Sequence, residues 1–110
     1  MIHKDLADGR WFTLSLMEQL ANVGCDVDRA IRWKNKGDAL YSDDALKRAF
    51  ELLYLTIKDP KNRKRLKEIC RVRELLLDYF MGDNIYSSTD EMWYKYFLDY
   101  NYMYALERGR

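Results

Sequence analysis

Four amphipathic segments, with apolar residues at three- and four-residue spacing, constrain this sequence more than any other feature. At about 100° per residue, that spacing places the apolar residues of a segment on one side of an α-helix. The helices are expected at 13–36, 43–58, 60–81 and 89–108. No segment alternates at period two for long enough to indicate a strand. Because short connections make consecutive helices antiparallel, the sequence predicts an all-α, up-down antiparallel four-helix bundle.

Residues suited to helix ends occur close to these boundaries. The expected N-terminal caps are Ser15 with Glu18, Ser42, Asp59 before Pro60, and Ser88 with Glu91. Gly37 fits the position just after a helix C-terminus, where a left-handed backbone is common. Gly24 could interrupt the first helix, although one glycine costs only about 1 kcal/mol relative to alanine.

Length and composition limit the class of protein. The 110 residues, 48% of them apolar, fit a single domain over 1–110, with 1–10 expected to be mobile. A formal net charge of +1 excludes a strongly basic polyanion-binding protein. Two cysteines, Cys25 and Cys70, fall inside helical patterns, and we expect them to be reduced thiols in the interior of the fold. With no signal peptide and no long apolar run, we expect a cytoplasmic protein that does not enter a membrane.

Motifs for catalysis, metals or cofactors are not evident in the sequence. It has no Gly-rich phosphate loop, no paired cysteines at metal-binding spacing and no nucleophile elbow. The single histidine, His3, lies in the expected mobile tail. We therefore expect a non-enzymatic protein without a metal ion or cofactor.

Arg73 is the first unusual residue, because it falls in the middle of an otherwise apolar helical seam. That seam comprises Leu66, Cys70, Arg73, Leu77 and Phe80. A buried guanidinium requires a carboxylate partner, and Glu18, Asp26 or Glu51 could supply it. The alternatives are a side chain that reaches solvent at the rim, or an arginine that binds a ligand within the bundle.

The stretch from Lys58 to Glu74 is the second unusual feature. It holds eight basic and three acidic residues, which gives a net charge of +5. This composition is typical of a solvated helix face, but it also permits contact with RNA or DNA phosphates. The candidate phosphate-contacting residues are Lys61, Lys64, Arg65, Lys67 and Arg71.

The last expected helix carries more large apolar residues than one face can hold. Its expected core-facing residues are Trp93, Phe97, Tyr100 and Tyr104, with Tyr96 beside them. A second set, Tyr94, Leu98, Tyr102 and Leu106, falls on other sides. A helix that is apolar all round is buried on more than one side, and tyrosine is enriched at interface centres. This favours a homodimer or a helical protein partner over scattered exposed aromatics or base stacking.

The element order, the run Arg-Val-Arg-Glu-Leu-Leu-Leu-Asp-Tyr-Phe at 71–80 and the aromatic last helix together resemble helical bundles of the HEPN and nucleotidyltransferase-associated type. The resemblance implies dimerisation through helices and a nucleotidyltransferase partner. The RNA-cutting branch of these families uses an arginine followed about one turn later by histidine. No histidine follows Arg71 or Arg73, so the resemblance does not extend to ribonuclease activity.

These observations favour a non-catalytic helical interaction subunit that acts by homo- or hetero-oligomerisation. One alternative is an RNA- or DNA-binding module that uses the basic third helix. Another is a ligand-binding bundle built around Arg73.

Overall fold

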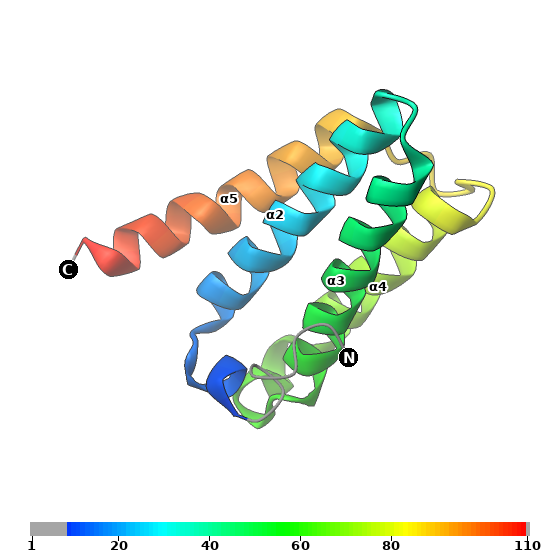
Figure 1. The fold of residues 1–110 in the computed structure, drawn as a ribbon. Helices are drawn as coiled ribbons and strands as arrows, with labels where there is room; N and C mark the ends of the chain where they lie inside the picture. The colour runs from blue at the N-terminus through cyan, green and yellow to red at the C-terminus, as the bar shows by residue number, and fades with distance from the viewer. Residues whose placement is uncertain (1–8, 110) are drawn as a thin grey trace.

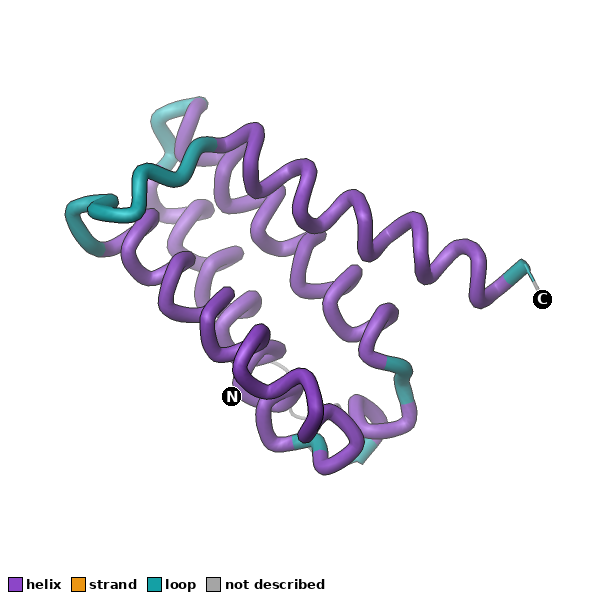
Figure 2. Tube along the Cα trace, turned by 180° about the vertical axis from the view of Figure 1, so that it is seen from behind, coloured by secondary structure: helices purple, strands orange, loops and turns teal. Residues whose placement is uncertain are grey.

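A computed structural model describes residues 9–109 and confirms the expected all-α helical bundle. Within that range, only helices and the loops that join them are present (Figure 2). The elements in chain order are η1 (Arg10–Thr13), α2 (Leu16–Asn35), α3 (Ala39–Lys58), η2 (Pro60–Arg65), α4 (Leu66–Met81) and α5 (Asp90–Arg108). Of the segment 1–10 that was expected to be mobile, residues 1–8 and with them His3 lie outside the described residues, whereas Arg10 begins η1.

In the view of Figure 1, α2 lies between α3 and α5, and α4 lies behind α3, against which it packs. Toward its C-terminus, α5 diverges from α2, so the end of α5 projects from the bundle (Figure 1). The core lies among all four α-helices. Its members with the largest buried side chains are Leu20, Val23, Val27, Ile31, Leu53, Ile69, Leu76 and Phe97, together with Trp11 from η1.

Helix α2 begins three residues after the predicted start at 13, directly after the predicted cap Ser15, and it ends within one residue of the predicted end. The Ser15 side chain accepts a hydrogen bond from the Glu18 backbone N–H at 3.2 Å, as expected for an N-cap. At the other end, the backbone N–H of Asp38 reaches the Trp33 carbonyl at 2.9 Å. That closure requires a positive φ at Gly37, which is 81°, because a side chain at this position would be strained.

The other helices begin at different residues from those predicted. Helix α3 begins at Ala39, because Asp38 accepts from the Tyr41 N–H and caps the helix four residues before Ser42. Ser42 is instead buried, and its hydroxyl donates to the Ala30 carbonyl at 2.8 Å. The cap of α5 is Thr89 rather than Ser88. In each case the residue that caps the helix is a neighbour with an equally suitable side chain.

The predicted helix 60–81 is divided in the structure. Asp59 caps it and Pro60 occupies its first turn, as expected, but residues Pro60–Arg65 form the 3-10 helix η2 before α4 begins. The 3-10 turns place Asn62 in the interior with 2% of its surface exposed.

A buried network of polar side chains joins η1, α2, α3 and η2 at one end of the bundle. Asn62 donates to the Gln19 side chain at 2.8 Å and to the Thr56 carbonyl at 3.0 Å. Gln19 donates to the Trp11 carbonyl at 3.0 Å, and the Trp11 indole donates to the Thr56 hydroxyl at 3.1 Å. Because every member is paired, the network holds the segment that precedes α2 against the end of α3.

Asp59 completes this network. Its carboxylate accepts from Gln19 at 2.8 Å and forms an ion pair with Lys61, although the residue is only 5% exposed. Burial acts to raise the pKa of Asp59, but the hydrogen bonds from Lys61 and Gln19 and the charge of Lys61 together lower it. The carboxylate therefore stays ionised inside the fold.

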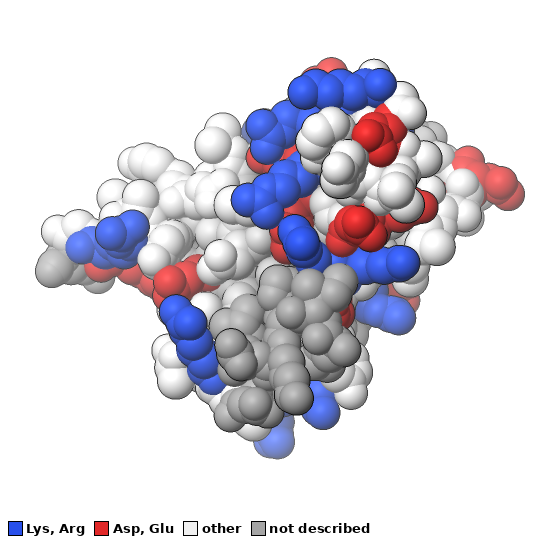
Figure 3. All heavy atoms as spheres, viewed as in Figure 1, with Lys and Arg blue, Asp and Glu red and all other residues white. Residues whose placement is uncertain are grey.

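The surface charge is unevenly distributed. In Figure 3, basic and acidic side chains cluster over α3 and the adjoining part of α2, whereas most of the visible surface along α5 is uncharged. No helix in the described range is sufficiently long and apolar to span a membrane.

Candidate protein-interaction surface on the last helix

One side of α5 is built into the core, as its spacing predicted. Trp93, Phe97 and Tyr100 are each no more than 5% exposed, whereas Tyr96 and Tyr104 are half-buried. The contact with α2 is especially close at Gly24, because a Cβ built there would lie 2.6 Å from Cβ of Phe97. Gly24 therefore does not break α2; it lets the two helices approach each other.

Hydrogen bonds fix the rest of α5 to α2. The Tyr104 hydroxyl donates to Glu18 at 2.8 Å, and the Ser15 hydroxyl donates to Glu107 at 2.7 Å. The carboxylate of Glu18 raises the pKa of Tyr104, so the phenol keeps its proton at neutral pH. The diverging C-terminal half of α5 is thus anchored to the start of α2.

Polar contacts also join α5 to α4. Near the start of α5, the Tyr79 hydroxyl donates to Asp90, and Asn35 donates to the same carboxylate at 3.0 Å. Farther along α5, the Tyr100 hydroxyl donates to Glu68 at 3.1 Å. These contacts hold α5 at two points along its length.

The opposite side of α5 presents large apolar side chains to solvent. The exposed fractions are 36% for Tyr94, 63% for Leu98, 65% for Tyr102 and 51% for Leu106. Their four-residue spacing makes them a continuous stripe, which we call the α5 stripe. All four lie outside the core of their own bundle, as the spacing predicted; their part in an interface stays a prediction.

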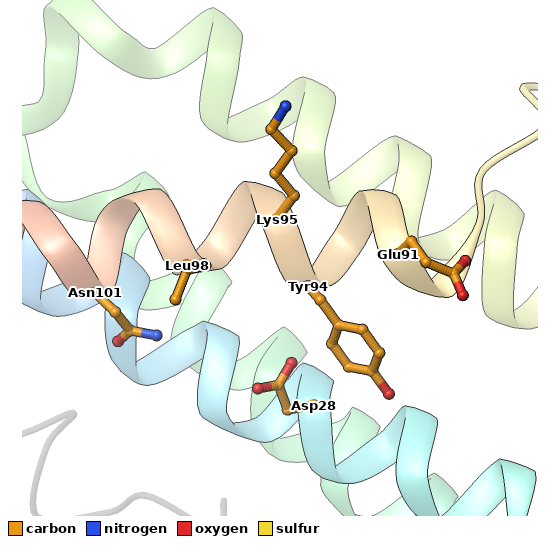
Figure 4. A pocket seen from close by; sticks show the side chains of 6 residues that line it. All are labelled: Asp28, Glu91, Tyr94, Lys95, Leu98 and Asn101. Carbon is orange, nitrogen blue, oxygen red and sulfur yellow. The ribbon is translucent and has the colours of Figure 1, made fainter.

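A groove of about 440 Å³ lies beside the first two residues of the α5 stripe, Tyr94 and Leu98, where α5 faces α2 (Figure 4). Both apolar and polar side chains line this groove. The lining residues are Asp28, Glu91, Tyr94, Lys95, Leu98 and Asn101. Of these, only Asp28 comes from α2.

Asp28 is the electrostatically unusual residue of this groove. Its Oδ1 atom is buried, and no described group gives that atom a hydrogen bond. Burial raises the pKa of Asp28, and the positive charge of Arg32 one turn away offsets this only in part. A buried carboxylate oxygen without a donor is unusual, because leaving a buried acceptor unpaired costs about 1–3 kcal/mol. This isolation of Asp28 Oδ1 could not be predicted from the sequence, which does not show where α5 crosses α2.

The prediction that Arg73 is buried is wrong, because its side chain is exposed. The buried face of α4 comprises Ile69, Val72 and Leu76 instead of the seam through Arg73, and Leu66 of that seam is also exposed. Helix α4 is turned toward α5, where Glu68 and Tyr79 make their hydrogen bonds. That rotation carries Arg73 out of the core.

The candidate phosphate-contacting residues divide into two groups. Three already have partners: Lys61 pairs with Asp59, Arg65 lies 2.5 Å from Glu68, and Arg71 lies 3.9 Å from Glu74. The other two, Lys64 and Lys67, are exposed and form no salt bridge with any residue in 9–109. The basic stretch is thus a partly neutralised surface.

Comparisons with known proteins give no further guidance: no protein-family model, no curated protein and no solved structure matches this chain. Within residues 9–109, no three histidine, cysteine, aspartate or glutamate side chains gather closely enough to hold a metal ion.

Proposed function

We propose that this protein is a non-catalytic interaction module that acts by pairing with a second copy of itself through the α5 stripe. The observation that carries the proposal is the exposure of four large apolar side chains in one row on a helix whose other side fills the core. Monomeric soluble proteins rarely expose continuous apolar patches of more than a few hundred Å².

The rigidity of α5 supports the proposal. Close packing at Gly24, together with hydrogen bonds from Ser15 and Tyr104, holds the helix in place. A surface that is already ordered loses little conformational entropy when it binds, so more of the burial energy contributes to affinity. Dimerisation through helices is also what the resemblance to HEPN-type bundles implies.

The nucleic-acid alternative has less support. Three of its five candidate cations are engaged with carboxylates of their own chain, which reduces the charge available to phosphates. The ligand-binding alternative loses its central residue, because Arg73 faces solvent. The free thiols of Cys25 and Cys70 fit a reducing setting such as the cytoplasm.

Light scattering coupled to size-exclusion chromatography tests the proposal. We expect the wild-type chain to be dimeric at tens of micromolar, and the double variant Leu98→Glu with Tyr102→Glu to be a folded monomer by circular dichroism. The matched control, Leu40→Glu with Tyr54→Glu, changes two equally exposed residues on α3 and is expected to stay dimeric. A monomeric wild type, or a double variant that still dimerises, overturns the proposal. If the double variant unfolds, Leu98→Ser is the milder replacement, and it is expected to weaken dimerisation while keeping the fold.

A further inference from the structure

Charged side chains lie on both flanks of the α5 stripe. Figure 4 shows Asp28 of α2 on one flank and Lys95 of α5 on the other, with Tyr94 and Leu98 between them. Neither charge forms a salt bridge with any residue of the described range. The groove is therefore lined by one acidic and one basic side chain, Asp28 and Lys95, that do not pair with each other.

A second pair of charges repeats this arrangement one turn away. Arg32 follows Asp28 by four residues on α2, and Glu91 precedes Lys95 by four residues on α5. Because α2 and α5 run in opposite directions, Arg32 and Glu91 lie at the same end of the groove (Figure 1). Both charges act on the phenol of Tyr94, as do Asp90 and Asp28. On the α2 flank, the acidic Asp28 is followed by the basic Arg32. On the α5 flank, the basic Lys95 lies across from Asp28, and the acidic Glu91 lies across from Arg32.

This pattern is complementary to itself when a two-fold axis relates the two copies. A two-fold axis that runs along α5 exchanges the two flanks, so Lys95 of one copy meets Asp28 of the other and Glu91 meets Arg32. An axis perpendicular to α5 that crosses midway between the two levels also pairs opposite charges, Asp28 with Arg32 and Lys95 with Glu91. Such an axis sets the two α5 stripes out of register, because these charges lie beside the first residues of the stripe. The axis along α5 pairs the charges and brings the whole length of both stripes together.

We propose that two copies pair with their α5 helices parallel, and that Lys95 of each copy binds Asp28 of the other in the groove beside the α5 stripe. This inference rests on the proposed function, to which it adds the orientation of the pair and the residues that determine specificity. The Lys95 ammonium pairs with the carboxylate of Asp28, which forms no salt bridge within the described range. Leu98 lies near the axis and meets its own counterpart.

Charge reversal tests the pairing in the full chain. We expect Asp28→Lys and Lys95→Asp each to raise the dimer Kd about tenfold or more, because each change creates two repulsive contacts per dimer. Combining both changes in one chain reverses each pair and is expected to restore the Kd to within about threefold of wild type. Asp44→Lys, on the exposed surface of α3, is the matched control and is expected to leave the Kd unchanged. Recovery in the combined chain also shows that Asp28→Lys permits folding.

The orientation has a separate test. In a background of Cys25→Ser and Cys70→Ser, Tyr102→Cys is expected to form a disulfide-linked dimer on mild oxidation, because parallel helices place both copies of residue 102 at one level. Antiparallel helices with the axis near the charged groups place residue 102 far from its own counterpart and give no such link. If neither single reversal weakens the dimer, or the combined chain stays weak, the Asp28–Lys95 pairing is wrong. Loss of dimerisation on introducing Leu98→Glu with Tyr102→Glu then still supports the proposed function, so the two failures are distinguishable.

Discussion

Gly24 of α2 lies directly against Phe97 of α5, and the missing side chain is what allows the contact. A Cβ at residue 24 would lie 2.6 Å from Cβ and 2.8 Å from Cγ of Phe97, closer than carbon atoms pack in proteins. The nearest of these atoms is fixed to the α5 backbone, so a change of rotamer at Phe97 would not relieve the clash. The spacing of the two helices is therefore set at this point.

Gly24→Ala is expected to destabilise the protein by about 1–3 kcal/mol, because the helices must separate to admit one methyl group. The higher helix propensity of alanine, about 1 kcal/mol, offsets part of this loss. Chemical denaturation measures the difference. Cys25→Ala changes the adjacent exposed residue and is expected to leave stability nearly unchanged. A Gly24→Ala protein more stable than wild type would show that the contact is looser than described.

Asn62→Ala is expected to lower the free energy of unfolding by about 1–3 kcal/mol. The change leaves the Gln19 side-chain oxygen without its donor and removes one of the two hydrogen bonds to the Thr56 carbonyl, in a region closed to water. Urea denaturation followed by tryptophan fluorescence is suitable, since Trp11 belongs to the same network. Arg63→Ala, at the exposed neighbouring position of η2, is the control. Equal stability of both variants would mean that water replaces the amide.

Acid is expected to destabilise the fold partly through Asp90. Burial acts to raise the pKa of Asp90, but hydrogen bonds from Tyr79 and Asn35 and the charge of Lys34 together lower it. A carboxyl whose pKa is lower in the folded state stabilises the fold above its unfolded value, about 3.9, and that contribution is lost as the pH falls through the folded value.

Asp90→Asn is therefore expected to reduce stability by roughly 1 kcal/mol at neutral pH and to flatten its decline below about pH 4. Thermal unfolding at a series of pH values measures both effects. Asp44→Asn removes one carboxylate from the exposed surface of α3 and serves as the control. If the stability of Asp90→Asn declines with falling pH as steeply as that of the wild type, another group causes the acid sensitivity. The buried Asp59 is then the next residue to test.

Arg73→Ala is expected to change stability by less than about 0.5 kcal/mol, as for other exposed positions without a special contact. Leu76→Ala, three residues along α4, is expected to cost about 2–5 kcal/mol because Leu76 is fully buried. Comparing the two by chemical denaturation determines which face of α4 is in the core. A large loss for Arg73→Ala would restore the seam that the sequence suggested.

The sequence predicted the class of fold well because helical periodicity and capping residues are local. The apolar faces of α2 and α3, the cap at Ser15 and the turn at Gly37 depend on neighbours within a few residues. The face of α4 could not be assigned in the same way. Leu66, Leu77 and Phe80 form as regular a seam as Ile69, Val72 and Leu76, and the choice between them depends on how α4 packs against its neighbouring helices.

The candidate site was predictable only in part. Residues of the α5 stripe could be recognised because they share one helix and its spacing. The role of Asp28 could not be recognised in this way, because burial of its Oδ1 atom without a hydrogen-bond donor depends on the angle at which α5 crosses α2. The network of Gln19, Asp59 and Asn62 was missed for a related reason: its partners are about 40 residues apart, and polar residues give no periodic signal.

That network has a consequence for the handedness of the bundle. Four helices joined by short loops can turn to the left or to the right, and both mirror arrangements bury much the same apolar stripes, because apolar attraction has no direction. Hydrogen bonds do have direction. Gln19 meets Asn62 and Asp59 with α3 and η2 on the side of α2 that they occupy here. The few buried polar groups thus add a directional preference for this arrangement, which apolar burial does not supply.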